Sequence, residues 1–401
     1  MKRIGWILVL LAAVTPAWAA KKITVGQLED LLHSLQQAKK TDAEVATRLK
    51  QIELSEELTR SRMNSLVSYV PGPLSTEQIY VLEASSADLI PPASDLPSTP
   101  APDAAAQQAI LTKAETYVAT NFERLPSLMA AKVTLRFQDN VEVVASGSGI
   151  IGNAKEAVTD SGISNPASFV HYINSAQGTV ASEHGAEKLP TEKDKTPWGP
   201  NKMIALEEPA PSLSSVFHEA QAAGSIQWLR WELVNGKQTA VYSFKVPGKN
   251  SQLALDVCCF PKVEQVGVAR FYNSMDAAQI AGPEASGGGA GGVTGNAQTN
   301  TDWHHFKATE PYHGEFFIDP GTGIVVRMIT EAELKPTDVV HQLDTRMDYG
   351  PVKVGSALLV VPVRTIVNTE VVPKGDSGAG KYSTRRTLFI AEYKDYKVAG
   401  H

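Results

Sequence analysis

The stretch IQWLRWELVNGKQTAVYSFKV, residues 226–246, decides the fold class of this chain. It contains two runs rich in aromatic and β-branched residues, which meet at Asn235-Gly236. This dipeptide tolerates the positive φ angles of a two-residue hairpin turn better than any other. The pattern therefore predicts two antiparallel strands, over residues 226–234 and 239–246.

Runs of the same kind lie on both sides of this hairpin. Upstream, Val133, Leu135 and Phe137 alternate with polar residues, as do Val141 and Val143. Downstream, strands are predicted over residues 252–260, 314–318, 324–330, 343–349, 357–369 and 384–395. Strands that follow one another through short turns indicate an antiparallel sheet. We expect a helix over residues 211–223 to cover one face of it.

The N-terminal part has a helical period instead. Three segments start with a capping-box pattern, which satisfies the free amides of a helix start; the pairs are Thr24 with Gln27, Thr41 with Glu44, and Ser75 with Gln78. A further helix is expected over residues 55–69, ended by Pro71-Gly72-Pro73. Each helix has one apolar stripe, so residues 20–90 are predicted to form a small helical bundle. The alternative is that the stripes bind a partner protein.

Proline and glycine divide the rest of the chain. Residues 91–103 contain Pro91, Pro92, Pro97, Pro100 and Pro102, and are interpreted as a semi-rigid linker. An alanine-rich helix over residues 104–123 then opens a β-rich domain, residues 104–398, in which the glycine-rich segment 282–300 is expected to be a mobile loop. The predicted fold class is α+β: an antiparallel sheet with a covering helix, preceded by the bundle.

The first nineteen residues predict export. Lys2 and Arg3 precede an apolar stretch over residues 4–14, and Ala17-Trp18-Ala19 is a small-x-small signature for signal peptidase. Cleavage is expected between Ala19 and Ala20. The apolar stretch is shorter than the roughly 20 residues of a spanning helix, so we expect a periplasmic or extracellular protein with no transmembrane segment in the mature chain.

Composition and charge limit the classes of partner. A chain that is 43% hydrophobic and 20% charged can form a globular core. Loss of Lys2 and Arg3 on cleavage changes the formal net charge from −6 to −8. The chain has no basic cluster of the kind that follows a phosphate backbone, so nucleic acid is excluded as a partner.

Cysteines and histidines supply the candidate binding residues. Cys258 and Cys259 are adjacent, and neighbours can bridge only through a strained ring. On a strand their sulfurs would lie on opposite faces, which favours two packed thiols over a redox or metal role. His304, His305 and His313 lie close together in the sequence and could donate to zinc. Solvated or core-edge histidines are the alternative.

Other patterns lack the context that their chemistry needs. Gly147-Ser148-Gly149-Ile150-Ile151-Gly152 resembles a dinucleotide-binding turn, but no acidic strand end follows about 20 positions later, so a glycine-rich turn is favoured. A serine-hydrolase G-x-S-x-G motif is missing, since position 146 is serine. Trp228 and Trp231 could stack on sugars, but a spacing of three on a strand predicts opposite faces. No catalytic residue and no cofactor are predicted.

Several blocks carry a resemblance to known proteins. They are SIQWLRW at 225–231, VYSFKVP at 241–247, YHGEFFIDPGTG at 312–323, YGPV at 349–352 and VPVR at 361–364. In this order they resemble a family of secreted bacterial proteins of unknown function. That family is similar in strand pattern to the half-barrel of the periplasmic lipoprotein carrier LolA and the sensor MucB/RseB. The resemblance implies an incomplete antiparallel barrel that wraps a helix and leaves an apolar concavity for acyl chains.

Together these observations predict a non-enzymatic exported protein that binds a hydrophobic, lipid-like ligand or an envelope partner. The alternative is a structural or protein-interaction component of the cell envelope without a cavity. A third hypothesis, a secreted hydrolase, requires catalytic groups to converge in a cleft, which spacing in the sequence does not reveal.

Overall fold

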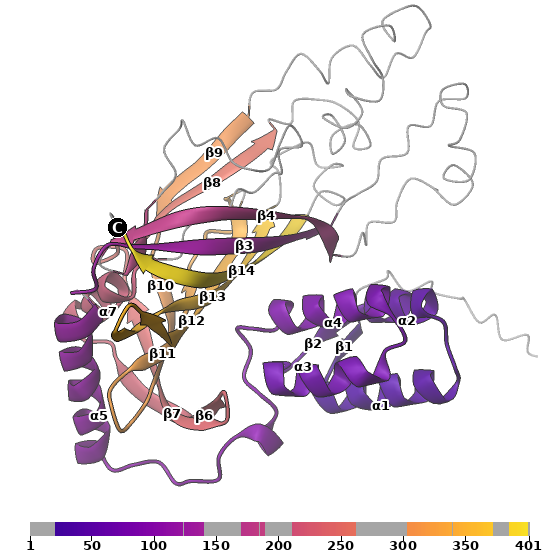
Figure 1. Ribbon diagram of the computed structural model, residues 1–401, viewed down its shortest axis with the longest axis horizontal. Helices are drawn as coiled ribbons and strands as arrows, with labels where there is room; N and C mark the ends of the chain where they lie inside the picture. The colour runs from indigo at the N-terminus through magenta and orange to yellow at the C-terminus, as the bar shows by residue number, and fades with distance from the viewer. Residues whose placement is uncertain are drawn as a thin grey trace, which may run out of the picture.

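The computed structural model describes residues 21–122, 124–139, 170–183, 185–188, 211–261, 303–338, 340–371 and 385–399 (Figure 1). The predicted export segment with Ala19 and Ala20, the glycine pattern at 147–152 and the glycine-rich segment 282–300 lie outside these residues.

The N-terminal region contains four α-helices: α1 Val25–Gln37, α2 Asp42–Leu49, α3 Arg60–Leu66 and α4 Pro73–Ser85. The capping boxes predicted at Thr24 and Thr41 are confirmed. The one predicted at Ser75 is wrong, because α4 begins at Pro73, which needs no N–H partner in a first turn. The Ser75 hydroxyl instead donates to Oδ1 of Asp42, at 2.5 Å.

A short parallel pair of strands, which the sequence analysis did not predict, completes this region. β1 Lys21–Ile23 pairs with β2 Ile52–Leu54. Strands of three residues are too short to show a period of two. The helix expected over 55–69 is also shorter, because α3 begins at Arg60 and ends in a 3₁₀ turn, η1 Val67–Tyr69. The four helices and β1–β2 enclose an apolar core that includes Val25, Leu28, Leu32, Val45, Leu49, Leu58, Met63 and Ile79.

A ten-stranded antiparallel sheet, not closed into a barrel, follows the linker. Its order is β5-β4-β3-β14-β13-β12-β11-β10-β7-β6. The bounds are β3 Leu128–Asp139, β4 Val170–Glu183, β5 Ala186–Glu187, β6 Gln227–Val234, β7 Lys237–Val246, β10 Tyr312–Ile318, β11 Val325–Ala332, β12 Val340–Val354, β13 Ala357–Val371 and β14 Arg385–Val398. The expectation of an α+β protein with an antiparallel sheet is confirmed.

The hairpin that decided the fold class forms as predicted. β6 and β7 pair through Val234 and Lys237, and the two turn residues Asn235 and Gly236 have φ angles of 51° and 75°. These positive values are those of a type I′ turn, whose twist matches that of the flanking strands. A separate ribbon of two strands, β8 Ala254–Pro261 and β9 Trp303–Thr309, lies beside the sheet.

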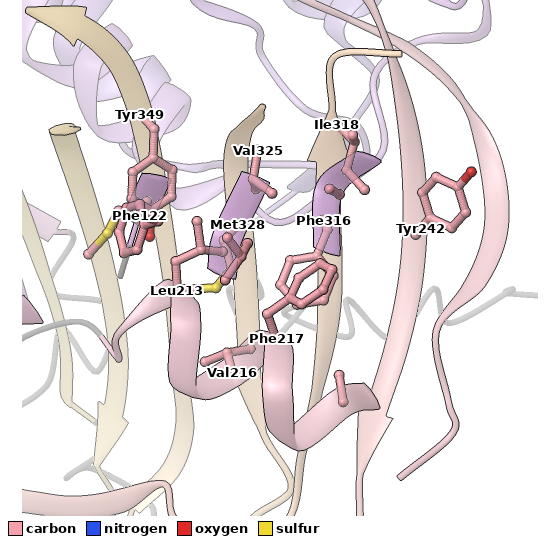
Figure 2. Close-up of a cluster of buried hydrophobic side chains, with 14 of the residues drawn as sticks. Phe122, Leu213, Val216, Phe217, Tyr242, Phe316, Ile318, Val325, Met328 and Tyr349 are labelled. Atoms are coloured by element: carbon pink, nitrogen blue, oxygen red, sulfur yellow. The ribbon is translucent and has the colours of Figure 1, made fainter. Parts of the chain in front are cut away.

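The two faces of the sheet have different coverings (Figure 1). The inner face, which carries Phe316, Met328 and Met347, packs against three elements: α5 Ala104–Tyr117, the π-helical turn η3 Val118–Phe122, and α7 Leu213–Ala222. In Figure 2 the side chains of Phe217 and Phe316 lie together, with ring centroids 5.0 Å apart. The helix expected over 211–223 therefore covers a face of the sheet.

The outer face, which carries Phe317, Arg327 and Asp348, meets the N-terminal helical region. Val81 and Ala84 of helix α4, with Ala87 just after it, pack on Phe137, Ile366, Leu388 and Ile390 of this face. The linker between the two regions contains a short 3₁₀ turn, η2 Ala93–Asp95.

Candidate functional site

An apolar pocket opens on the inner face, where the ribbon meets the sheet. The enclosed space is about 30 Å³, and it is about 370 Å³ when the open solvent at its mouth is included. Eight described residues line it: Pro211 before α7; Leu253, Ala254 and Leu255 at the start of β8; Thr330 and Ala332 on β11; and Leu343 and Thr345 on β12. We call this site the inner-face pocket.

Strand register explains how the pocket is built. Thr330 lies opposite Thr345, which in turn lies opposite Val367 of β13. Below these positions Leu255, Val340, Leu343, Val367 and Phe389 form a buried apolar cluster. Leu255 of the ribbon therefore packs in the same apolar cluster as residues of the sheet. The pocket is the space between the ribbon and the sheet.

The side chains that line the pocket are mostly aliphatic. Its eight described residues are aliphatic apart from the two threonine hydroxyls, and none of them ionises near neutral pH. Ligand pockets of about 300–1,000 Å³ that are mainly apolar with a few polar groups are typical of small-molecule sites. The enclosed space of about 30 Å³ is well below this range, so the pocket as it stands suits only a small apolar group.

A second constellation lies on the outer face, beneath the helical region. Both terminal nitrogens of Arg364 donate to the carboxylate of Glu83, each at 2.6 Å. Arg346 Nη1 lies 2.6 Å from Glu57 Oε1, and the two side chains are each 4% exposed. These bonds join α4 and the segment before α3 to β12 and β13.

The network continues across the sheet to β6. Arg327 Nε donates to Asp348 Oδ1 at 2.7 Å. Arg230 contacts Glu232 at 2.7 Å and Glu315 at 2.8 Å. Arginine is suited to such positions because its planar group can donate two parallel hydrogen bonds. We call these residues the outer-face ionic network.

Burial and charge act in opposite directions on the carboxyl groups of this face. Burial disfavours the charge of Asp348, yet Arg327 and Arg346 hold its pKa well below the ordinary value. Burial raises the pKa of Glu232 to about 7, against the opposing charge of Arg230. Burial likewise raises the pKa of Asp344 to about 7, although Gln342 donates a hydrogen bond to it.

The outer-face ionic network holds the helical region on the sheet. Removing one partner from a buried pair leaves an uncompensated charge, which costs much more than the pair contributes. Such a network therefore favours one orientation of the helical region on the sheet. The sequence analysis missed these residues because their partners are separated by 281 and 289 positions, and no local pattern links them.

Of the histidine and cysteine candidates, the structure describes the side chain of His313. His313 lies on β10, with Nε2 3.4 Å from Glu331 and Nδ1 3.5 Å from Glu333. The hydrogen bond with Glu331 raises its pKa. His304 and His305 lie on β9, opposite Phe260 and Cys258, and Cys259 lies at a bulge of β8. The side chains of His304, His305, Cys258 and Cys259 are outside the described part of the structure. In that described part, no three His, Cys, Asp or Glu side chains are grouped as metal ligands.

The prediction that Trp228 and Trp231 lie on opposite faces is wrong. Their ring centroids are 4.8 Å apart in an edge-to-face contact, and Trp228 makes a second edge-to-face contact with Tyr242. The reason is a β-bulge between Trp228 and Arg230, which inserts Leu229 and interrupts the alternation. The indole N–H of Trp231 donates to Pro100 O at 2.8 Å, which ties the linker to this strand.

Comparison with protein-family models, with curated proteins and with solved structures gives no match for this chain. Among the described helices, none combines the length and apolar character needed to cross a membrane.

Proposed function

We propose that this chain is an exported binding protein, without catalytic activity, that holds an apolar, lipid-like group in the inner-face pocket. The aliphatic lining of that pocket is the observation that carries the proposal. A bound hydrocarbon chain would contact Leu253, Leu255 and Leu343, and each methylene group removed from water contributes about 0.8 kcal/mol.

The finer architecture belongs to the same proposal. The open sheet is an incomplete barrel of the LolA and MucB/RseB kind, and α7 is the helix that it wraps. Support comes from the contact of α7 with the inner face, where Phe217 and Phe316 pack together. The helical region is a small bundle in this proposal, supported by its own apolar core. Export, with cleavage between Ala19 and Ala20, supplies the compartment in which envelope lipids are met.

A second candidate function is that of a protein-interaction component of the cell envelope. It is favoured by the edge strand β6, on which Leu229 and Leu233 are 45% and 44% exposed. Exposed apolar side chains on an unpaired strand edge mark a surface suited to another chain.

The proposal is tested on the mature chain, residues 20–401, purified without detergent. Mass spectrometry of its organic extract should find a lipid in near-stoichiometric amount, and a fluorescent fatty acid should displace that lipid. In the Ala332→Phe variant a larger side chain fills the inner-face pocket, so both the lipid and the binding of the probe should be lost.

The matched control is Leu358→Phe. Leu358 is 73% exposed, and it lies at the β12–β13 hairpin rather than at the pocket. This variant should keep the lipid, and both variants should unfold at temperatures close to that of the parent protein. A clean extract from the parent chain, together with no binding of the fluorescent fatty acid, would contradict the proposal.

A further inference from the structure

The inner-face pocket is nearly closed in this structure. Its enclosed space of about 30 Å³ has room for water-sized molecules only, whereas small-molecule sites usually measure about 300–1,000 Å³. An acyl chain of the kind proposed above therefore enters only if a wall of the pocket moves outward.

The walls of the pocket differ in how firmly they are held. β11 and β12 lie inside the ten-stranded sheet, where each forms a hydrogen-bonded ladder with a strand on both sides. The wall that faces them is the ribbon of β8 and β9, and among the described strands these two pair only with each other (Figure 1). Moving β11 or β12 breaks backbone hydrogen bonds of the sheet, whereas the ribbon lifts with its own ladder intact.

Apolar contacts hold the ribbon against the sheet. Leu255 of β8 is 4% exposed, and Phe306 of β9 is partly buried against the same cluster. On the sheet side this cluster consists of Val340, Leu343, Val367 and Phe389. Apolar contacts have no preferred direction, so a hydrocarbon chain between the ribbon and the sheet replaces them with contacts of the same kind. The ligand thereby offsets the cost of lifting the ribbon.

The base of the ribbon, in contrast, is fixed by hydrogen bonds. Glu219 of α7 is 9% exposed, and its Oε2 accepts from the backbone N–H of Gln252 at 3.0 Å and from the Tyr312 hydroxyl at 2.9 Å. The Ser251 hydroxyl donates to the Glu310 carbonyl oxygen at 2.7 Å. Gln252 precedes β8 and Glu310 follows β9, so both chains of the ribbon are held where they leave the sheet.

We propose, building on the proposed function of the pocket, that the ribbon of β8 and β9 is its lid. The ribbon pivots about the base at Glu219 and Ser251, and it opens a path between Leu255 and Leu343 for an acyl chain. The structure shows the closed position, and a bound chain keeps the ribbon raised. Opening of the ribbon then limits how fast a ligand binds.

The first test measures opening without a ligand. In a background with Cys258→Ser and Cys259→Ser, Leu343→Cys places a thiol under the ribbon, and Met347→Cys places one on the same strand, in the cluster that α5 and α7 cover. Both positions are 6% exposed, so N-ethylmaleimide reaches either thiol only when its cover moves. Labelling of Leu343→Cys should be faster than labelling of Met347→Cys by roughly tenfold or more.

The lid is then loosened from the ribbon side. Phe306→Ala removes apolar contact with the sheet and changes none of the described residues that line the pocket. It should accelerate labelling of Leu343→Cys by roughly tenfold or more and leave labelling of Met347→Cys unchanged. Thr309→Ala, at an exposed position of the same strand, is the matched control and should change neither rate.

These rates decide whether the ribbon is a lid. Unfolding of the whole chain would expose both thiols alike, so the difference between them reports the ribbon alone. Equal labelling of Leu343→Cys and Met347→Cys would overturn the proposal. So would a rate for Leu343→Cys that Phe306→Ala leaves unchanged, or one that Thr309→Ala raises as much.

The second test follows binding of a fluorescent fatty acid to the mature chain by stopped flow. The observed rate should reach a plateau at high probe concentration, and Phe306→Ala should raise that plateau by roughly tenfold while Thr309→Ala leaves it unchanged. A rate that keeps rising with probe concentration and is equal in both variants would overturn gating by the ribbon. Fast labelling of Leu343→Cys without any binding of the probe would instead overturn the proposed function, and with it the entry of an acyl chain, while supporting the movement of the ribbon.

Discussion

Glu83 of α4 and Arg364 of β13 form a bidentate ion pair in which the side chains are 1% and 7% exposed. The two residues are 281 positions apart. The pair is therefore one of the contacts that join the N-terminal helical region to the sheet, and its energetics can be tested by removing one charge at a time.

Glu83→Gln leaves the Arg364 guanidinium buried without its counter-charge. We expect a loss of about 3–5 kcal/mol in the free energy of unfolding, measured by urea denaturation. Glu392→Gln is the control, because Glu392 pairs with Arg60 at the surface and is 56% exposed; its effect should be below about 1 kcal/mol. Adding Arg364→Met to Glu83→Leu removes the unpaired charge. If stability then recovers, the loss is caused by that charge and not by lost packing. Equal effects of Glu83→Gln and Glu392→Gln would contradict this account.

Stability should also depend on pH through the buried carboxyl groups of the outer face. Asp344 has a pKa raised to about 7 in the folded chain, against about 4 when unfolded. The folded state then binds the proton more tightly, so stability falls as pH rises from about 4 to 7. Asp348 has a lowered pKa, and its contribution is lost as pH falls below about 4.

These opposite dependences predict greatest stability at mildly acidic pH. Asp344→Asn removes the first of them, so the free energy of unfolding should become flatter between pH 5 and 8, and at pH 8 it should exceed that of the parent chain by roughly 2–4 kcal/mol. Asp30→Asn is a control on an exposed carboxyl and should leave the profile as it is. A profile of the Asp344→Asn variant that parallels that of the parent chain would refute the assignment.

Trp231 connects the linker to the sheet, and this connection can be tested separately from packing. Trp231→Phe keeps an aromatic ring near Trp228 but loses the donor to Pro100 O. One neutral hydrogen bond contributes about 1 kcal/mol, so we expect a loss of that size. Proteolysis within residues 91–103 should also become faster, since the linker is released from β6. Trp228→Phe, which breaks no hydrogen bond to the linker among the described residues, should not accelerate cleavage there.

Local signals in the sequence predicted local structure. Asn235-Gly236 predicted the hairpin correctly because a type I′ turn depends on two residues alone. β4 was missed because its sequence, VHYINSAQGTVASE, is mostly polar and lacks a clear apolar alternation. The Trp228 and Trp231 prediction failed because a bulge is a property of the pairing between two strands, and a single strand does not reveal it. The ionic network and the inner-face pocket combine residues far apart in the chain, so neither could be found from spacing.

Gly314 tests how closely β10 and β11 pack. A Cβ atom at this position would lie 1.9 Å from the Ile329 carbonyl oxygen and 2.8 Å from the Phe244 ring. The first contact is with backbone, which cannot rotate away as a flexible side chain can, so the pairing of β10 with β11 would have to shift. Gly314→Ala should therefore destabilise the protein by about 3 kcal/mol or more, well beyond the usual effect of a surface substitution.

Gly178→Ala is the matched strand control, because no atom lies within 4 Å of its added Cβ, and it should be neutral or slightly stabilising. Thermal unfolding of both variants distinguishes the close contact at β10 from a general effect of replacing glycine in a strand.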